Sequence, residues 1–207
     1  MGVFSYDGVI GRAINRIFDC VCLSFLWIVF SIPVITMGAA STALYYTVNK
    51  VFREEEGGLL KSFWRSFKSN FLQTFPVWLV FLVVYIVFLM NGYYGYAFFA
   101  NDVMPGGILI VLIVVAAILL TWSGYIFPYI ARFENTTRET LKNCAYLMVR
   151  HLPWSLALLA ILLGSMVLFF LVPFGLAFAP AVWGWTSNLV LERIFAKYIP
   201  SNEPEEA

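Results

Sequence analysis

Residues 31–41 read SIPVITMGAAS, and they interrupt the longest apolar run in the N-terminal quarter of the chain. Pro33 removes a backbone N–H donor and disfavours helical geometry at Ile32, and Gly38 allows the backbone to turn or to approach a neighbour closely. The stretch therefore has three interpretations: a turn between two helices, a proline kink in one membrane helix, or a signal-peptide cleavage site after Ala40. The choice between them sets the topology of the chain.

The composition indicates an integral membrane protein. Of the 207 residues, 61% are hydrophobic and only 12% are charged, and the mean hydropathy is +0.83. Soluble domains are nearer half apolar and one quarter charged, so this chain cannot cover its surface with polar groups. We expect one all-helical membrane domain over residues 1–207, because a chain of this length suits a single compact bundle.

Four apolar runs are long enough to cross about 30 Å of hydrocarbon at about 1.5 Å per helical residue. If residues 31–37 form a turn, one further span lies before the turn and one after it, which gives six spans in all. If these residues are instead a kink in a single helix, the chain has five spans. The predicted spans are 11–32, 37–53, 76–92, 108–130, 153–172 and 174–191.

The lysines and arginines favour six spans. They cluster in segments 50–73 and 131–151 and at the C-terminal end, whereas segment 91–107 contains none. The positive-inside rule then places the basic segments and both termini in the cytoplasm. A single kinked helix would place Arg12 and Arg16 on the opposite side, against this pattern. A turn is also favoured over signal-peptide cleavage, because cleavage after Ala40 would leave a new N-terminus in the middle of a small-residue pattern.

The first basic segment has the pattern of a helix that lies in the headgroup plane. Over residues 58–74, apolar side chains recur every three or four positions, and Lys61, Arg65 and Lys68 form the other face. We expect this interfacial basic face to contact anionic lipid, or alternatively to dock on an acidic partner.

The second basic segment, residues 136–151, predicts another interfacial helix. Thr136 or Thr137 can cap its N-terminus, and Pro153 begins the following span. Each interfacial helix is thus followed by a pair of apolar runs, without a residue-by-residue repeat.

Asp19 is the ionisable residue that stands out within a predicted span. Arg12, Asn15, Arg16 and Asp19 share one face of the first helix through spacings of three, four and seven residues. A carboxylate inside a membrane is a functional candidate by default, because burying it without a partner is costly. Pairing with Arg16 would make it structural instead, and both interpretations stay open.

The turn and the helix after it carry a second group of candidates, Pro33, Thr36, Gly38 and Thr42. Small residues four positions apart allow close helix packing in lipid, where association depends on contact and hydrogen bonds. The same residues could instead line a substrate path. Packing is the simpler use.

The sequence contains little that supports catalysis. It has one histidine, three cysteines without a metal-binding spacing, and neither a Gly-rich phosphate loop nor a nucleophile beside a base. We therefore expect a protein that is not an enzyme, with no catalytic residue, cofactor or metal ion and no nucleic-acid partner. The expected partners are membrane lipids and further copies of the chain.

Three stretches together resemble the YesL-like family of bacterial integral membrane proteins: LSFLWIVFSIPVITMGAASTALYYTVNKVFREEE, SFWRSFKSNFLQTF and FPYIARFENTTRETLKNCAYLMVRHL. The resemblance covers nearly the whole chain. Its most specific elements are Pro-x-x-Thr-x-Gly (Pro33, Thr36, Gly38) and Phe-Lys-x-Asn-Phe (Phe67, Lys68, Asn70, Phe71). It implies a bacterial cell membrane and genes beside carbohydrate ABC transporters and glycoside hydrolases, but neither an established function nor catalytic residues.

Two classes of function follow. The first is an accessory or regulatory protein of a carbohydrate ABC uptake system, which would bind a permease subunit through its basic helices and small-residue faces. The alternative is a small transporter or channel that acts alone or as a homo-oligomer. Apart from Asp19, however, the spans offer only scattered hydroxyl and amide side chains for the polar path that transport requires.

Overall fold

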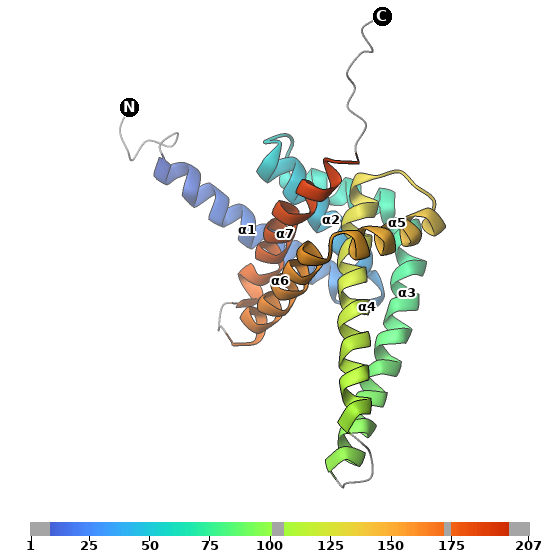
Figure 1. Ribbon diagram of the computed structural model, residues 1–207. Coiled ribbons are helices and arrows are strands. Elements are labelled where there is room, and N and C mark those ends of the chain that lie inside the picture. The colour runs from blue at the N-terminus through green and yellow to red at the C-terminus, as the bar shows by residue number, and fades with distance from the viewer. Residues whose placement is uncertain (1–8, 101–105, 172–174, 199–207) are drawn as a thin grey trace, which may run out of the picture.

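The structure is a computed structural model that describes residues 9–100, 106–171 and 175–198 (Figure 1). Within these ranges the chain is helical and joined by short connections. The elements are α1 (Val9–Ser31), η1 (Val34–Thr36), α2 (Met37–Thr47), η2 (Val48–Arg53), α3 (Leu59–Ala100), α4 (Gly106–Arg132), α5 (Thr137–Arg150), α6 (Leu152–Leu171) and α7 (Gly175–Phe195).

Four of the described helices contain stretches that are long and apolar enough to cross a membrane. These stretches are Ile14–Ser31, Leu59–Ala97, Ile110–Arg132 and Leu152–Phe169. The structure therefore supports an all-helical membrane protein with four candidate spans, whereas six were predicted. The two predicted spans without such a stretch among the described residues are 37–53 and 174–191. The first falls short because α2 has only 11 residues and continues as a wider π-helical segment, η2.

Residues 31–37 form a turn between two antiparallel helices. Halfway along the pair, Trp27 Nε1 donates to Ser41 Oγ at 3.2 Å, and at its open end Arg16 Nη1 donates to the carbonyl of Val51 at 3.1 Å. A kinked single helix could not make both contacts. The proline and the small residues thus separate α1 from α2.

The turn lies at the depth of Trp78 on α3, because Trp78 Nε1 donates to the carbonyl of Val34 at 2.6 Å. About 20 further residues of α3, roughly 30 Å at 1.5 Å per residue, continue beyond this point. The hairpin of α3 and α4 therefore reaches well past the first hairpin, as Figure 1 shows.

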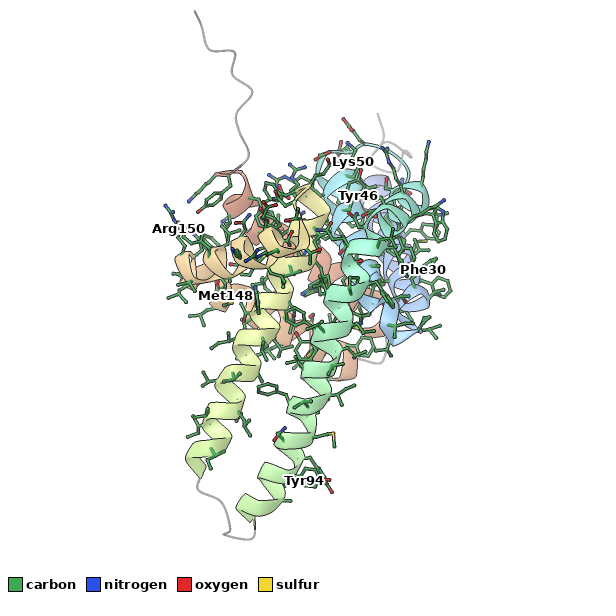
Figure 2. All side chains as sticks on the ribbon, turned by 90° about the vertical axis from the view of Figure 1, so that its right-hand side faces the viewer. Phe30, Tyr46, Lys50, Tyr94, Met148 and Arg150 are labelled. Carbon is green, nitrogen blue, oxygen red and sulfur yellow. The ribbon has the colours of Figure 1, made fainter. Side chains whose placement is uncertain are left out.

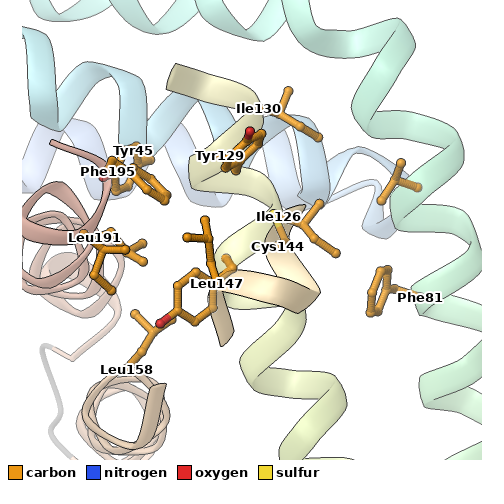
Figure 3. Packing of buried hydrophobic residues seen from close by; sticks show 13 residues of the cluster. Tyr45, Phe81, Ile126, Tyr129, Ile130, Cys144, Leu147, Leu158, Leu191 and Phe195 are labelled. Atoms are coloured by element: carbon orange, nitrogen blue, oxygen red, sulfur yellow. The ribbon is translucent and has the colours of Figure 1, made fainter. Parts of the chain in front are cut away.

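The predicted interfacial helix 58–74 and the predicted span 76–92 are one helix, α3, with Pro76 inside it. Pro76 cannot donate to the preceding turn, and Thr74 Oγ1 donates to the carbonyl of Asn70 at 2.8 Å. A missing N–H and a side chain that bonds the preceding turn both bend helices without ending them. In Figure 3 the ribbon of α3 accordingly crosses the upper edge and then descends on the right.

The predicted second interfacial helix agrees with α5 to within one residue at each end. Thr136 caps it: Thr136 Oγ1 accepts from the backbone of Glu139, and the Glu139 carboxylate accepts from the backbone of Thr136. At its other end the backbone of His151 leaves the helical region, and Ser155 Oγ donates to the carbonyls of Met148 and His151. These bonds give the carbonyl groups at the break a hydrogen-bond donor. The break lets the chain change direction, so α5 lies crosswise to α4 before α6 begins (Figure 1).

The core surrounds α2. Almost every residue of this helix is buried, from Gly38 to Tyr45 and again at Thr47. One side of α2 packs with α1 and the first part of α3 through Leu23, Ala40, Ala43, Leu44, Val48 and Phe63. The other cluster, drawn in Figure 3, joins α2, α3, α4, α5, α6 and α7. Its members are Tyr45, Val77, Phe81, Tyr125, Ile126, Tyr129, Ile130, Cys144, Leu147, Leu158, Leu191, Ile194 and Phe195.

Basic side chains gather at one end of this bundle, which we call the basic end. Figure 2 places Lys50 and Arg150 there, and Tyr94 near the opposite tip of α3. The last turns of α4 and α7 bring Arg132 and Arg193 to the same end. The segments in which the sequence concentrates its positive charge therefore meet in space.

Candidate functional site

A buried carboxylate joins four elements at the basic end. Glu192 on α7 has a side chain that is only 3% exposed, and its oxygens lie 3.4 Å from Arg53 Nη1 and 3.6 Å from Arg132 Nε. Tyr45 Oη donates to the same carboxylate at 3.1 Å. One anion thus holds η2, α4, α7 and the end of α2 together.

A second layer of hydrogen bonds extends this arrangement. Asn188 Nδ2 donates to Asn49 Oδ1 at 3.2 Å, and Asn49 Nδ2 donates to Glu54 Oε1 at 2.8 Å. Arg132 reaches the same Glu54 carboxylate at 3.5 Å. We call the connected set the Glu192 cluster; its members are Tyr45, Asn49, Arg53, Glu54, Arg132, Asn188 and Glu192.

Local sequence explains how the side chains converge. Tyr45, Asn49 and Arg53 are four residues apart along α2 and η2, and Asn188 and Glu192 are four apart on α7. Residues with this spacing lie on one face of a helix. Two polar stripes on otherwise apolar helices therefore face each other across the bundle.

The segment η2 is a π-helix, in which the backbone of Glu54 donates to the carbonyl of Asn49, five residues earlier. Such wider turns are rare and are found frequently at functional sites. Here the wider turn carries both Asn49 and Arg53 towards α7. The helix distortion and the polar cluster occupy the same few residues.

The surrounding loop is also ionically paired. Lys50 binds Glu54 at 3.0 Å and also binds Glu56. The hydrogen bond from Lys50, and then its charge, lower the pKa of the Glu56 carboxyl. Arg16 binds Glu55 at 2.8 Å. The short connection from η2 to α3 is therefore tied to α1 and to η2.

The chemistry of the Glu192 cluster is electrostatic. Its members are a phenol, two amides, two guanidinium groups and two carboxylates, so it holds no side chain that is a usual nucleophile beside a base. Among the described residues, no group of three His, Cys, Asp or Glu side chains could hold a metal ion. The geometry fits a clamp that fixes the basic end and depends on charge balance.

The predicted cluster on the first helix is organised differently from the expectation. The side chain of Arg12 lies outside the described residues, and Asn15 is exposed. Arg16 forms an ion pair with Glu55 and lies over the ring of Phe52, and the two interpretations of Asp19 stay predictions. Asp19 is half-buried on α1.

The turn residues make close contacts. Thr36 Oγ1 donates to the carbonyls of Phe30 at 2.5 Å and Pro33 at 2.8 Å, and Thr42 Oγ1 donates to the carbonyl of Gly38 at 3.1 Å. A Cβ atom on Gly38 would lie 2.6 Å from Trp78 Cβ. Gly38 and Thr42 are buried, whereas Pro33 is exposed and Thr36 is partly buried, and the hydroxyls of both threonines donate to backbone carbonyls.

The basic face of the first part of α3 is exposed at all three predicted positions, Lys61, Arg65 and Lys68. The apolar face differs from the expected stripe, because Trp64 is 54% exposed while Phe63 is 1% exposed. Phe63 instead packs in the core with residues of α1 and α2.

Glu192 was not predicted as a site residue, because it directly follows the last predicted span and a charged residue is common at the end of a helix. The signal that could have found it is the four-residue spacing of Asn188 and Glu192, matched by Tyr45, Asn49 and Arg53. Polar residues repeated on one face of an apolar helix indicate an internal partner.

The comparisons with known proteins add a family without an assigned activity. Residues 20–92 match the family described as Protein of unknown function, DUF624. Neither the curated proteins nor the solved structures give a match. The matched residues run from α1 through the turn, α2 and η2 into α3, and thus include Tyr45, Asn49 and Arg53 of the Glu192 cluster.

Proposed function

We propose that this chain is a non-catalytic accessory or regulatory protein of the bacterial cell membrane, which binds another membrane protein along the far part of its α3–α4 hairpin. We call residues 83–97 of α3 and 107–118 of α4 the distal arm. The observation that carries the proposal is the contrast between a basic end fixed by the Glu192 cluster and an apolar arm that projects beyond the other helices (Figure 1).

The distal arm exposes large apolar side chains on both of its helices. At its base, Tyr85 Oη lies 2.8 Å from Ser123 Oγ and fixes the two helices to each other. Beyond that contact, the exposed residues include Ile86, Val87, Leu89, Met90, Ile108, Ile110, Val111, Ile113, Val114 and Ile118. Helices associate in lipid through close van der Waals contact, so this arm offers a long surface for a partner helix.

The class of partner rests on the resemblance to the YesL-like family, whose genes lie beside carbohydrate ABC transporters. A permease subunit of such a system is the proposed partner. The positive-inside rule places the basic end and both termini in the cytoplasm. In this orientation the distal arm extends towards the outer face, and the basic end is available to cytoplasmic components.

Transport by the chain itself has less support, because polar side chains in the spans are engaged locally. Thr121 Oγ1 donates to the carbonyl of Ala117 at 2.8 Å, and Ser165 Oγ donates to that of Leu162 at 2.8 Å. A hydroxyl bonded to its own helix is less available to replace the hydration of a passing solute. Transport stays testable with the purified protein in vesicles, as uptake of oligosaccharides by the wild type but not by Asp19→Asn.

The test is recovery of partners from native membranes with a tagged full-length chain. Val83→Trp alters the distal arm, and Val167→Trp on α6 is its matched control, since each valine is 55% exposed. We expect the wild type and Val167→Trp to recover a sugar permease in mild detergent, and Val83→Trp to recover much less. Equal recovery by both variants, or recovery of only further copies of the chain, would contradict the proposal.

A further inference from the structure

A recess of about 410 Å³ lies between η2 and α7, on the outer side of the Glu192 cluster. It is lined by Val48, Phe52, Arg53, Trp185, Asn188, Leu189 and Arg193. The lining therefore combines two guanidinium groups and an amide with three large apolar side chains and one smaller one. That combination suits a ligand that is anionic at one end and apolar at the other.

Arg193 supplies positive charge that no carboxylate of the described residues balances. The ion pairs at the basic end join Arg16, Lys50, Arg53 and Arg132 to the four carboxylates of Glu54, Glu55, Glu56 and Glu192. Arg193 lies outside this set, with its guanidinium over the ring of Trp154 at 5.7 Å. Arg53 is also accessible, because its side chain is 51% exposed despite its contact with Glu192.

The apolar part of the recess follows one face of α7 away from these charges. Trp185, Leu189 and Arg193 are four residues apart, so they form a stripe about 12 Å long at 1.5 Å per residue. Trp185 is 51% exposed and Leu189 is 52% exposed. The stripe passes from exposed apolar surface to a cation at the basic end, in the order in which a phospholipid presents its acyl chain and its phosphate.

We propose that this recess binds one anionic phospholipid, with the phosphate at Arg193 and Arg53 and an acyl chain along Leu189 and Trp185. Basic pockets between helices on the cytoplasmic side suit anionic headgroups. A free phosphate would use the arginines but gain nothing from the apolar wall, which is why a lipid is the better ligand. The site is separate from the distal arm, so it does not depend on the proposed permease contact.

The experiment measures lipid binding to the purified full-length chain in detergent by native mass spectrometry. Phosphatidylglycerol, phosphatidylcholine and inorganic phosphate are offered separately. We expect the wild type to bind one phosphatidylglycerol in preference to phosphatidylcholine and to show no defined complex with phosphate. Near a membrane surface each basic residue contributes about 1 kcal/mol, so Arg193→Gln should weaken phosphatidylglycerol binding about five-fold.

Arg150→Gln is the matched control, because Arg150 is also an exposed arginine at the basic end, with its guanidinium over the ring of Tyr146. It lies outside the recess and should bind phosphatidylglycerol like the wild type. Leu189→Ser, at an exposed position, should weaken binding of the lipid by removing part of the acyl-chain wall. Equal losses in Arg193→Gln and Arg150→Gln would overturn the site, and so would equal binding of the two lipids; phosphate bound as tightly as lipid would overturn the choice of ligand.

Discussion

Replacing Glu192 tests whether the buried carboxylate holds the basic end together. Glu192→Leu removes the anion that contacts Arg53 and Arg132 and leaves Tyr45 Oη, in a residue that is 1% exposed, without its acceptor. Glu192→Gln keeps an oxygen that can accept from Tyr45 but removes the charge. The leucine variant should therefore be less stable than the glutamine variant.

The expected magnitudes follow from burial. Breaking a fully buried ion pair by removing one partner costs about 3–5 kcal/mol. Here the side chains of Arg53 and Arg132 are 51% and 33% exposed, so water can solvate them in part, and Arg132 keeps its contact with Glu54. We expect about 3 kcal/mol for Glu192→Leu, which includes the orphaned phenol, and about half of that for Glu192→Gln.

The assay is thermal unfolding of the purified protein in detergent, followed by the loss of the monodisperse species. For a chain of this size, about 1 kcal/mol corresponds to a change of about 2–4 °C in Tm, so the leucine variant should melt about 10 °C lower and the glutamine variant about 5 °C lower. Glu55→Gln is the control, because the side chain of Glu55 is 76% exposed and its pair with Arg16 should contribute little.

Two results would refute this reasoning. If Glu192→Leu melts with the wild type, the cluster does not stabilise the basic end. If the glutamine variant loses as much as the leucine variant, the hydrogen bond from Tyr45 is irrelevant to the cost. Adding Arg132→Gln to Glu192→Leu should cost less than the sum of the two single changes, since they remove the same contact.

Three further predictions concern packing, pH and topology. Gly38→Ala should lower Tm by several degrees, because the new Cβ would lie 2.6 Å from Trp78 Cβ, whereas Gly164→Ala, with nothing within 4 Å, should not; equal melting would contradict the tight contact. The pKa of Glu139 is lowered by its hydrogen bonds with Thr136, so the carboxylate stabilises the fold at neutral pH. The difference in Tm between wild type and Glu139→Gln should therefore disappear as the pH falls through the lowered pKa. A difference in Tm that grows on acidification would contradict this assignment. In a chain without other cysteines, Tyr94→Cys, at an exposed position near the tip of the distal arm, should react with a membrane-impermeant thiol reagent from outside the cell, and Lys142→Cys only after permeabilisation; the opposite pattern would invert the topology.

Local chemistry predicted several elements closely. The helix at 136–151 was predicted with Thr136 or Thr137 as its cap, and in the structure Thr136 caps α5 and forms a capping box with Glu139. The turn at 31–37 was favoured by Pro33 and by the charges on either side of it. The capping signal acts within a few positions, whereas the turn needed both a local proline and the distribution of lysines and arginines along the whole chain.

The continuity of α3 could not be predicted in the same way. Pro76 is a normal helix start in a sequence, but inside a membrane protein a helix can continue through proline when neighbours support the freed groups. The support here comes from packing of Phe63 and Val77 on segments that are distant in the chain.

The Glu192 cluster lay beyond prediction for a related reason. Tyr45 and Glu192 are separated by 147 positions. Asp19 attracted notice because it interrupts an apolar run, whereas Glu192 stands at the end of one. A sequence shows which residues differ in polarity from their neighbours in the chain. Only the fold shows which residues from distant parts of the chain are in contact.

The wide turns of η2 have a consequence for how this chain tolerates change in length. A π-helical segment is equivalent to an α-helix that has received one extra residue and absorbed it without breaking. Deleting one residue between Val48 and Arg53 would let the backbone return to regular α-helical winding, with better local hydrogen bonds. Because the wide turn absorbs the extra residue locally, Arg53 would keep nearly its present direction towards Glu192, whereas deleting one residue from the regular part of α2 would rotate Arg53 by about 100°. We therefore expect a chain shortened within η2 to have a more regular helix and to keep the contact of Arg53 with Glu192, and a chain shortened within α2 to lose that contact. The wide turn is thus the place where this helix can change its length by one residue without changing which side chains face α7.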